Sequence, residues 1–170
     1  MPSQEHLDEQ RFFGYLAAID KKILAAGGDS WDCLSPPERA TAIGYRLACE
    51  ISNGGFEQFF INPAGDHWCE TREVLQTVAA VRLAEMFDEA LSVFPDGAPS
   101  TDQLTRCREY EQAGDHARWL MEQLTAEYYN LQSESDEHCL YRKLSLFAVK
   151  QLGEGTEGPG LTVLWPLRLE

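Results

Sequence analysis

Two short clusters in the sequence contain side chains that could bind a metal ion. The first comprises Asp66, His67, Cys69 and Glu70, and the second is Asp-Glu-His-Cys at 136–139. Neither cluster has the spacing of a zinc site, such as paired cysteines two residues apart or two histidines one helical turn apart. Adjacent residues on a helix point in different directions and do not readily share one ion. We therefore interpret both clusters as solvated helix starts, and we expect no metal and no cofactor.

A glycine-rich segment at residues 153–158 spells GxGxxG, the pattern of a dinucleotide-binding loop. Such a loop must follow a strand and precede a helix whose N-terminus holds the pyrophosphate. Here a predicted helix precedes the glycines, and Glu154 and Glu157 would repel phosphate. We interpret the segment as a linker. Because no P-loop, nucleophile elbow or suitable Cys/His arrangement is found, we predict no catalytic residues.

The most distinctive stretch is Asn-Gly-Gly-Phe-Glu-Gln-Phe-Phe-Ile-Asn at residues 53–62. Asn53 and Gly54 can end a helix in the left-handed conformation, and Gly55 permits a sharp turn or a close approach. The phenylalanines would then anchor the next helical turn in the core. These are Phe56, Phe59 and Phe60.

The polar residues of this motif allow two interpretations. In the structural one, Gln58 and Asn62 hydrogen-bond backbone groups that the break in the helix sets free. In the functional one, Asn53, Gln58 and Asn62 form a polar binding site. We prefer the structural interpretation, because it gives every residue a role without a ligand.

The charge of the chain is strongly negative, with 28 acids, 14 bases and a net charge of −14. This excess disfavours nucleic acid and anionic membranes, which carry the same sign, and favours a basic partner. A solubility adaptation is the simplest alternative. Residues 51–100 hold eight acids but only two bases, Arg72 and Arg82.

Five of these acids form the predicted partner-binding face. Glu85, Asp88 and Glu89 share one side of a predicted helix, and Glu70 and Glu73 form a similar pair one helix earlier. Duplex DNA carries about one charge per 1.7 Å, so ten well-placed carboxylates would copy only about 17 Å of duplex. A monomer could thus imitate one half-site, and a homodimer could imitate two.

The elements that must position these residues are predicted to be helices. Apolar residues recur at helical spacing, as in Phe12, Leu16, Ile19 and Ile23. A start signal lies at 35–38, Ser-Pro-Pro-Glu, where serine can cap and glutamate occupies the capping-box position. Breaks are expected at Asn-Gly-Gly (53–55), near Ala-Ala (79–80), after Phe94 and near Asp115.

The fold prediction is therefore all-α. We expect a compact orthogonal bundle of about seven or eight helices over residues 1–152. Residues 153–170 would form a Gly/Pro-rich linker and an apolar tail, of which 161–164 is the only strand-like piece.

The cellular location is predicted from cysteines and termini. Five cysteines without a close pair indicate reduced, mostly buried thiols rather than disulfides or zinc ligands. The first ten residues are polar and acidic, unlike a signal peptide, and no apolar run reaches the length of a membrane span. We predict a cytoplasmic protein.

The core of the motif, Asn-Gly-Gly-Phe-x-Gln-Phe, precedes a Val/Leu-rich helix pair that ends at Phe94-Pro95. This combination resembles a bacterial all-helical domain family whose best-described member is a DNA-mimic protein. The resemblance extends from Ser35 to Gln151. It implies a helical fold without catalytic residues, and a role in occupying the DNA-binding face of a transcription factor. It transfers no partner-contact residues.

Three functions follow as hypotheses. The first is a non-enzymatic acidic protein that binds a basic protein surface, such as a transcription factor, and contacts neither nucleic acid nor membrane directly. The second is a neutralising, immunity-type partner of a toxin or effector enzyme, which would use the same electrostatic steering. The third is a small hydrolase, which needs a deep pocket that holds a carboxyl of raised pKa beside Gln58 and Asn62.

Overall fold

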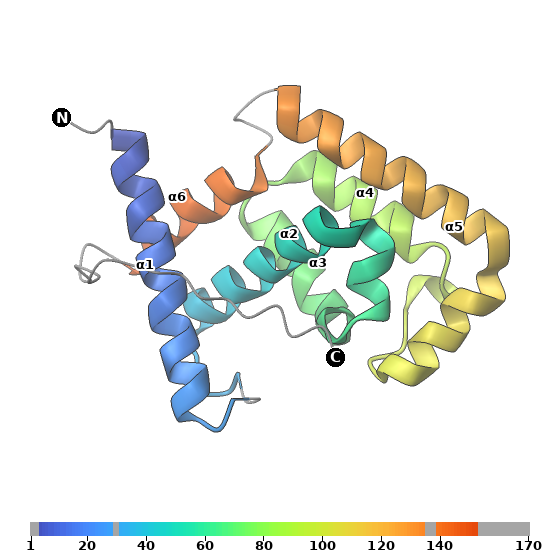
Figure 1. The fold of residues 1–170 in the computed structure, drawn as a ribbon, viewed down its shortest axis with the longest axis horizontal. Coiled ribbons are helices and arrows are strands. Elements are labelled where there is room, and N and C mark those ends of the chain that lie inside the picture. Colours follow the sequence, from blue (N-terminus) through green and yellow to red (C-terminus); the bar gives the residue numbers. More distant parts are fainter. Residues whose placement is uncertain (1–3, 29–30, 135–138, 153–170) are drawn as a thin grey trace. The chain divides into compact units, whose positions relative to one another are not determined.

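The computed structural model describes residues 4–28, 31–134 and 139–152, and these are helical with no strand among them (Figure 1). The all-α prediction is confirmed. The elements in chain order are α1 (Gln4–Ala25), α2 (Pro36–Ile61), the 3-10 helix η1 (Pro63–His67), α3 (Trp68–Thr77), α4 (Val81–Leu91), the 3-10 helix η2 (Pro95–Gly97), α5 (Gln103–Glu134) and α6 (Leu140–Leu152).

The number of α-helices in the described residues is six, so the prediction of seven or eight was wrong. Two predicted breaks are kinks inside helices. In α2, Gly55 leaves the helical conformation at φ 82° and ψ −174°, and in α5 Gly114 does so at φ 70° and ψ −151°. Because the helix resumes at once, no loop separates its two parts. The predicted junction near Ala79 is confirmed, since α3 ends at Thr77 and α4 begins at Val81.

Several predictions fall outside the described residues. They concern the GxGxxG segment, the strand-like piece at 161–164, and most of the second polar cluster, at 136–138. The cysteines are free, as predicted, but Cys33 and Cys69 are exposed and the other three only half-buried. The expectation of mostly buried thiols was therefore wrong. No helix in the described residues is long and apolar enough to cross a membrane.

The chain divides into two compact units. The first contains the described residues up to Arg39 together with those from Ser145 onward. At the start of α2 in this unit, Glu38 accepts hydrogen bonds from the Ser35 N–H at 2.9 Å and the Ser35 hydroxyl at 2.8 Å. The glutamate half of the predicted capping box is thus formed, whereas the Ser35 hydroxyl donates to Glu38 instead of accepting a backbone N–H. Lys22 adds an ion pair to Glu38 at 2.5 Å.

The second unit, Ala40–Leu144, holds the motif and the acidic helices. Its core is aromatic. The Phe60 ring lies 5.6 Å from the Phe87 ring and 4.9 Å from the Phe94 ring, measured between centroids. Phe56 and Phe59 are also buried, so the motif phenylalanines anchor α2 as predicted.

Candidate protein-interaction site

The kink of α2 frees backbone groups, and α5 supplies their partners. The Phe56 N–H donates to the Thr125 hydroxyl at 3.1 Å. The Tyr129 hydroxyl donates to the carbonyls of Ile51 and Ser52, at 3.3 and 3.0 Å. Unpaired backbone groups in a core raise the free energy of the fold, and the hydrogen bonds from α5 offset this cost at the kink.

The second glycine of the motif is required by both conformation and space. The φ of 82° and ψ of −174° at Gly55 lie in a region that only glycine adopts readily. A Cβ added there would stand 2.5 Å from the Thr125 hydroxyl oxygen. Gly55 therefore lets α2 bend where it meets α5.

The polar residues of the motif do not bind freed backbone groups, and that expectation was wrong. The Gln58 amide donates to the Glu50 carboxylate at 2.9 Å, and the Asn62 amide donates to the same oxygen at 2.8 Å. Glu50 lies about one helical turn before the kink. The bend of α2 brings the Glu50 carboxylate beside both amides. Asn53 is exposed. Whether the motif has a role beyond structure stays a prediction.

The hydrolase hypothesis required a deep pocket beside these amides. Both amides are bound by Glu50, and Gln58 and Asn62 line neither the groove beside Gly54 and Glu57 nor the groove beside Ala79 and Arg82. The geometry at this point therefore lends the hypothesis no support.

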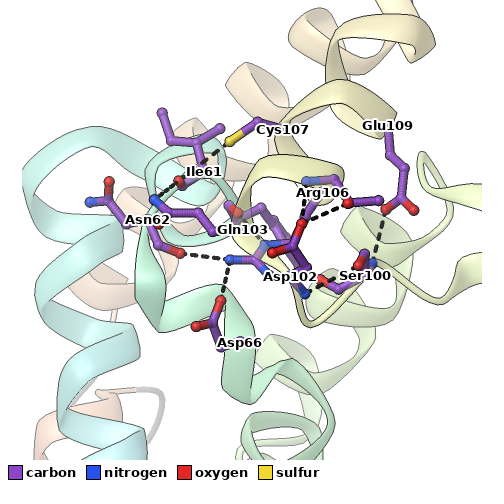
Figure 2. Close-up of polar contacts among 11 residues, drawn as sticks. Ile61, Asn62, Asp66, Ser100, Asp102, Gln103, Arg106, Cys107 and Glu109 are labelled. Carbon is purple, nitrogen blue, oxygen red and sulfur yellow. Dashed lines mark hydrogen bonds and ion pairs between the residues drawn. The ribbon is translucent and has the colours of Figure 1, made fainter. Parts of the chain in front are cut away.

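Arg106 is the buried cation of this unit, and sequence analysis missed it. Its guanidinium donates to the Phe60 carbonyl at 2.5 Å, the Asn62 carbonyl at 2.9 Å and the Ser100 carbonyl at 2.6 Å. It also donates to the Asp66 carboxylate at 2.7 Å, and its side chain has no exposed surface. Figure 2 shows the guanidinium between Asp66 and Ser100.

This arginine closes the C-terminal end of α2. The last carbonyls of a helix have no partner within it. Arg106 satisfies that of Phe60, and Gln103 donates to that of Ile61 at 2.8 Å (Figure 2). One sequence signal was available, because Arg106 lies four residues before the buried Tyr110 and hence on the apolar face of α5.

The first polar cluster of the sequence is divided among different contacts. Asp66 pairs with Arg106, whereas the His67 ring lies 3.2 Å from the Glu70 carboxylate. Cys69 is exposed. Among the described residues, no group of three or more His, Cys, Asp or Glu side chains could hold a metal ion.

The five predicted partner-binding acids lie on α3 and α4, which pack against each other. Two of them are neutralised in part by arginines. Asp88 receives two hydrogen bonds from Arg72, at 2.5 and 3.0 Å, and Glu85 receives one from Arg82 at 2.9 Å. Hydrogen bonding and the charge of Asp88 raise the pKa of Arg72, as expected for a formed ion pair.

The remaining three acids of the predicted partner-binding face are Glu70, Glu73 and Glu89. Glu73 and Glu89 are exposed, and no Lys or Arg of the described chain pairs with them. The Glu70 carboxylate lies 3.2 Å from the His67 ring, which carries charge when protonated. Arg82 also binds Glu127 of α5, so its single charge is shared by two carboxylates. Five acids thus face two arginines on these helices, and their role as a partner-binding face stays a prediction.

The fold and the charge define a class, the acidic all-helical proteins. Within it, the model of the DMP19-like protein family matches residues 32–150, most of the chain, and the chain belongs to that family. This is a DNA mimic protein family, so the predicted family is confirmed, whereas the assignment of the Asn-Gly-Gly-Phe motif to that family stays a prediction. No curated protein and no solved structure matches the chain.

Proposed function

We propose that this protein is a non-enzymatic DNA mimic that occupies the basic surface of a DNA-binding protein, such as a transcription factor. The observation that carries the proposal is membership of the DMP19-like family. The net charge of −14 gives the molecule the sign of DNA, and long-range attraction would steer a basic partner toward it.

The exposed carboxylates of α3 and α4 supply the contacts in this proposal. Glu73 and Glu89 contribute most, because their charges are not neutralised by an arginine of the described chain. Two hydrogen bonds from Arg72 fix the position of the Asp88 carboxylate, just as the DNA backbone fixes the position of each phosphate. A partner that reads phosphates with Lys and Arg would meet carboxylates here, and its affinity would fall as salt rises.

The test is displacement from DNA. Proteins of the source cell are bound to DNA-cellulose at low salt, and the column is washed with the purified full chain. A DNA mimic releases one or a few DNA-binding proteins. In a mobility-shift assay with each released protein, the full chain should compete with DNA, and less well at higher ionic strength.

Charge variants make the test specific. Glu73→Gln with Glu89→Gln should weaken the competition roughly tenfold at low salt. The control is Glu9→Gln with Glu111→Gln, which removes the same charge from exposed positions on α1 and α5. The proposal fails if the column releases no protein, or if both double variants compete as well as the natural chain.

A further inference from the structure

A groove of about 340 Å³ lies beside the kink of α2 and belongs entirely to the second unit. From α2 it is lined by Gly54 and Glu57. From α5 its lining includes Met121, Glu122 and Tyr129. The groove is therefore apolar along its wall and carries one carboxylate from each helix.

The side of α5 that lines the groove also carries exposed aromatic residues. Trp119, Glu122, Ala126 and Tyr129 follow at steps of three and four, so they share one side of the helix. Trp119 is 56% exposed and Tyr129 49%, which is unusual for such large rings. Tryptophan and tyrosine are enriched among the residues that dominate binding at protein interfaces.

A buried hydroxyl lies close to the same carboxylates. Tyr110 is 5% exposed, and its hydroxyl has no hydrogen-bond partner among the described residues. Burial raises the pKa of Tyr110 to about 12, and the charges of Glu57 and Glu122 act in the same direction, while Arg118 acts against them. Arg118 is itself bound to Asp115 at 2.9 Å. The Tyr110 hydroxyl therefore lies close to both carboxylates, and its interaction with the Glu57 side chain also raises this pKa.

We propose that this groove receives an arginine or lysine side chain of a basic protein partner, held between Glu57 and Glu122 beside Tyr129, while Trp119, about 15 Å from Tyr129 along α5, packs on a neighbouring part of the partner. The inference rests on the proposed function for the class of partner, and adds a contact site outside α3 and α4. Carboxylates bind the cationic head, and aromatic faces attract it through cation–π contact. A second copy of this chain is a poor occupant, since both copies carry a charge of −14.

The probe for this site is a blocked peptide of alternating arginine and glycine, titrated into the isotope-labelled full chain at low salt. Backbone amide shifts should change at Gly54, Glu57, Glu122 and Tyr129, together with the Trp119 indole signal. A peptide of alternating glutamine and glycine serves as the uncharged control. One of alternating leucine and glycine tests for apolar binding.

Variants separate this site from the acidic helices. Glu57→Gln with Glu122→Gln should lower the affinity for the arginine peptide roughly tenfold. Trp119→Ala should lower that affinity roughly threefold. Glu73→Gln with Glu89→Gln should leave the affinity at the groove unchanged. The spectra of the free variants report whether each remains folded.

Several results would overturn the inference. They are shifts confined to α3 and α4, equal shifts over all acidic surfaces, no binding, or equal binding of the leucine peptide. Unchanged affinity after both glutamate substitutions has the same consequence. None of these results decides the proposed function, because displacement of a protein from DNA is measured separately with the natural chain.

Discussion

The hydroxyl of Thr125 in α5 accepts a hydrogen bond from the backbone N–H of Phe56 in α2, at 3.1 Å. The same hydroxyl donates a hydrogen bond to the Met121 carbonyl at 2.7 Å. One side chain thus replaces the helical partner that Phe56 loses at the kink. Since Phe56 has no exposed surface, water cannot take that role. The bend of α2 therefore depends on a residue 69 positions away in the sequence.

Replacing Thr125 by valine should destabilise the protein by about 1–3 kcal/mol, because valine keeps the shape and leaves the Phe56 N–H without an acceptor. The measurement is the free energy of unfolding from urea denaturation. Thr125→Ser is the matched control, since it retains the hydroxyl, and it should lose less. A valine variant as stable as the natural chain would show that this hydrogen bond does not support the kink.

Replacing Gly55 by alanine should cost at least about 1–3 kcal/mol, because alanine adopts the backbone conformation of this position only with strain. The added Cβ would also press on the Thr125 hydroxyl. Gly14→Ala is the control with the opposite expected sign. Gly14 lies inside α1, and a Cβ added there would have no other atom within 4 Å. That variant should be stabilised by about 0.5–1 kcal/mol in thermal or urea unfolding. A neutral Gly55→Ala would contradict the described kink.

Replacing Arg106 by methionine should lower the free energy of unfolding by about 3 kcal/mol or more. The substitution removes the donor from three backbone carbonyls at once, and each buried acceptor left unpaired costs about 1–3 kcal/mol.

The control for this substitution is Arg108→Met, which removes the same charge from an exposed position of the same helix. It should change stability by no more than about 0.5 kcal/mol. If both variants unfold at the same urea concentration, Arg106 does not hold the end of α2 in solution.

Asp102 should contribute a pH-dependent part of the stability. Its carboxylate accepts the Thr105 hydroxyl at 2.6 Å and the Thr105 N–H at 2.9 Å, just before α5 begins. These two bonds lower the pKa of Asp102 below its ordinary value of 3.8. The folded state therefore favours the charged form. Its contribution is complete above pH 3.8 and is lost as the pH falls through the lowered pKa.

The measurement is the difference in free energy of unfolding between the natural chain and Asp102→Asn. Asparagine can also cap a helix, so the difference should be small and constant near neutral pH. It should shift in favour of asparagine as the solution is made more acidic than the ordinary pKa. A difference that stays constant throughout acid titration would exclude this role.

Much of the secondary structure was predictable because its causes are local. Helical spacing of apolar residues marks α1 and the pair α3 and α4, and Glu38 accepts the Ser35 N–H at the predicted start of α2. The break at residues 53–55 was also predicted, but the left-handed conformation was expected at Asn53 and Gly54, whereas Gly55 is the residue with positive φ. The helix count was too high because the chain resumes its helix directly after each glycine.

The candidate site was only partly predictable. The five acids of α3 and α4 could be placed on helix faces from spacing alone. Their neutralisation could not, because Arg72 and Asp88 are 16 positions apart and meet only when the two helices pack. The groove beside Glu57 and Glu122 was likewise hidden, since its two walls come from helices distant in sequence.

By itself, the sequence determined the helical class, the negative charge and the glycine kink, because composition, periodicity and local conformation need no long-range contact. Only the tertiary structure decided which polar groups are occupied. Glu50 takes the amides of Gln58 and Asn62, and Arg106 takes the carbonyls at the end of α2. The physical reason is that a hydrogen bond requires its two atoms within about 3 Å, and that proximity arises from packing rather than from order along the chain.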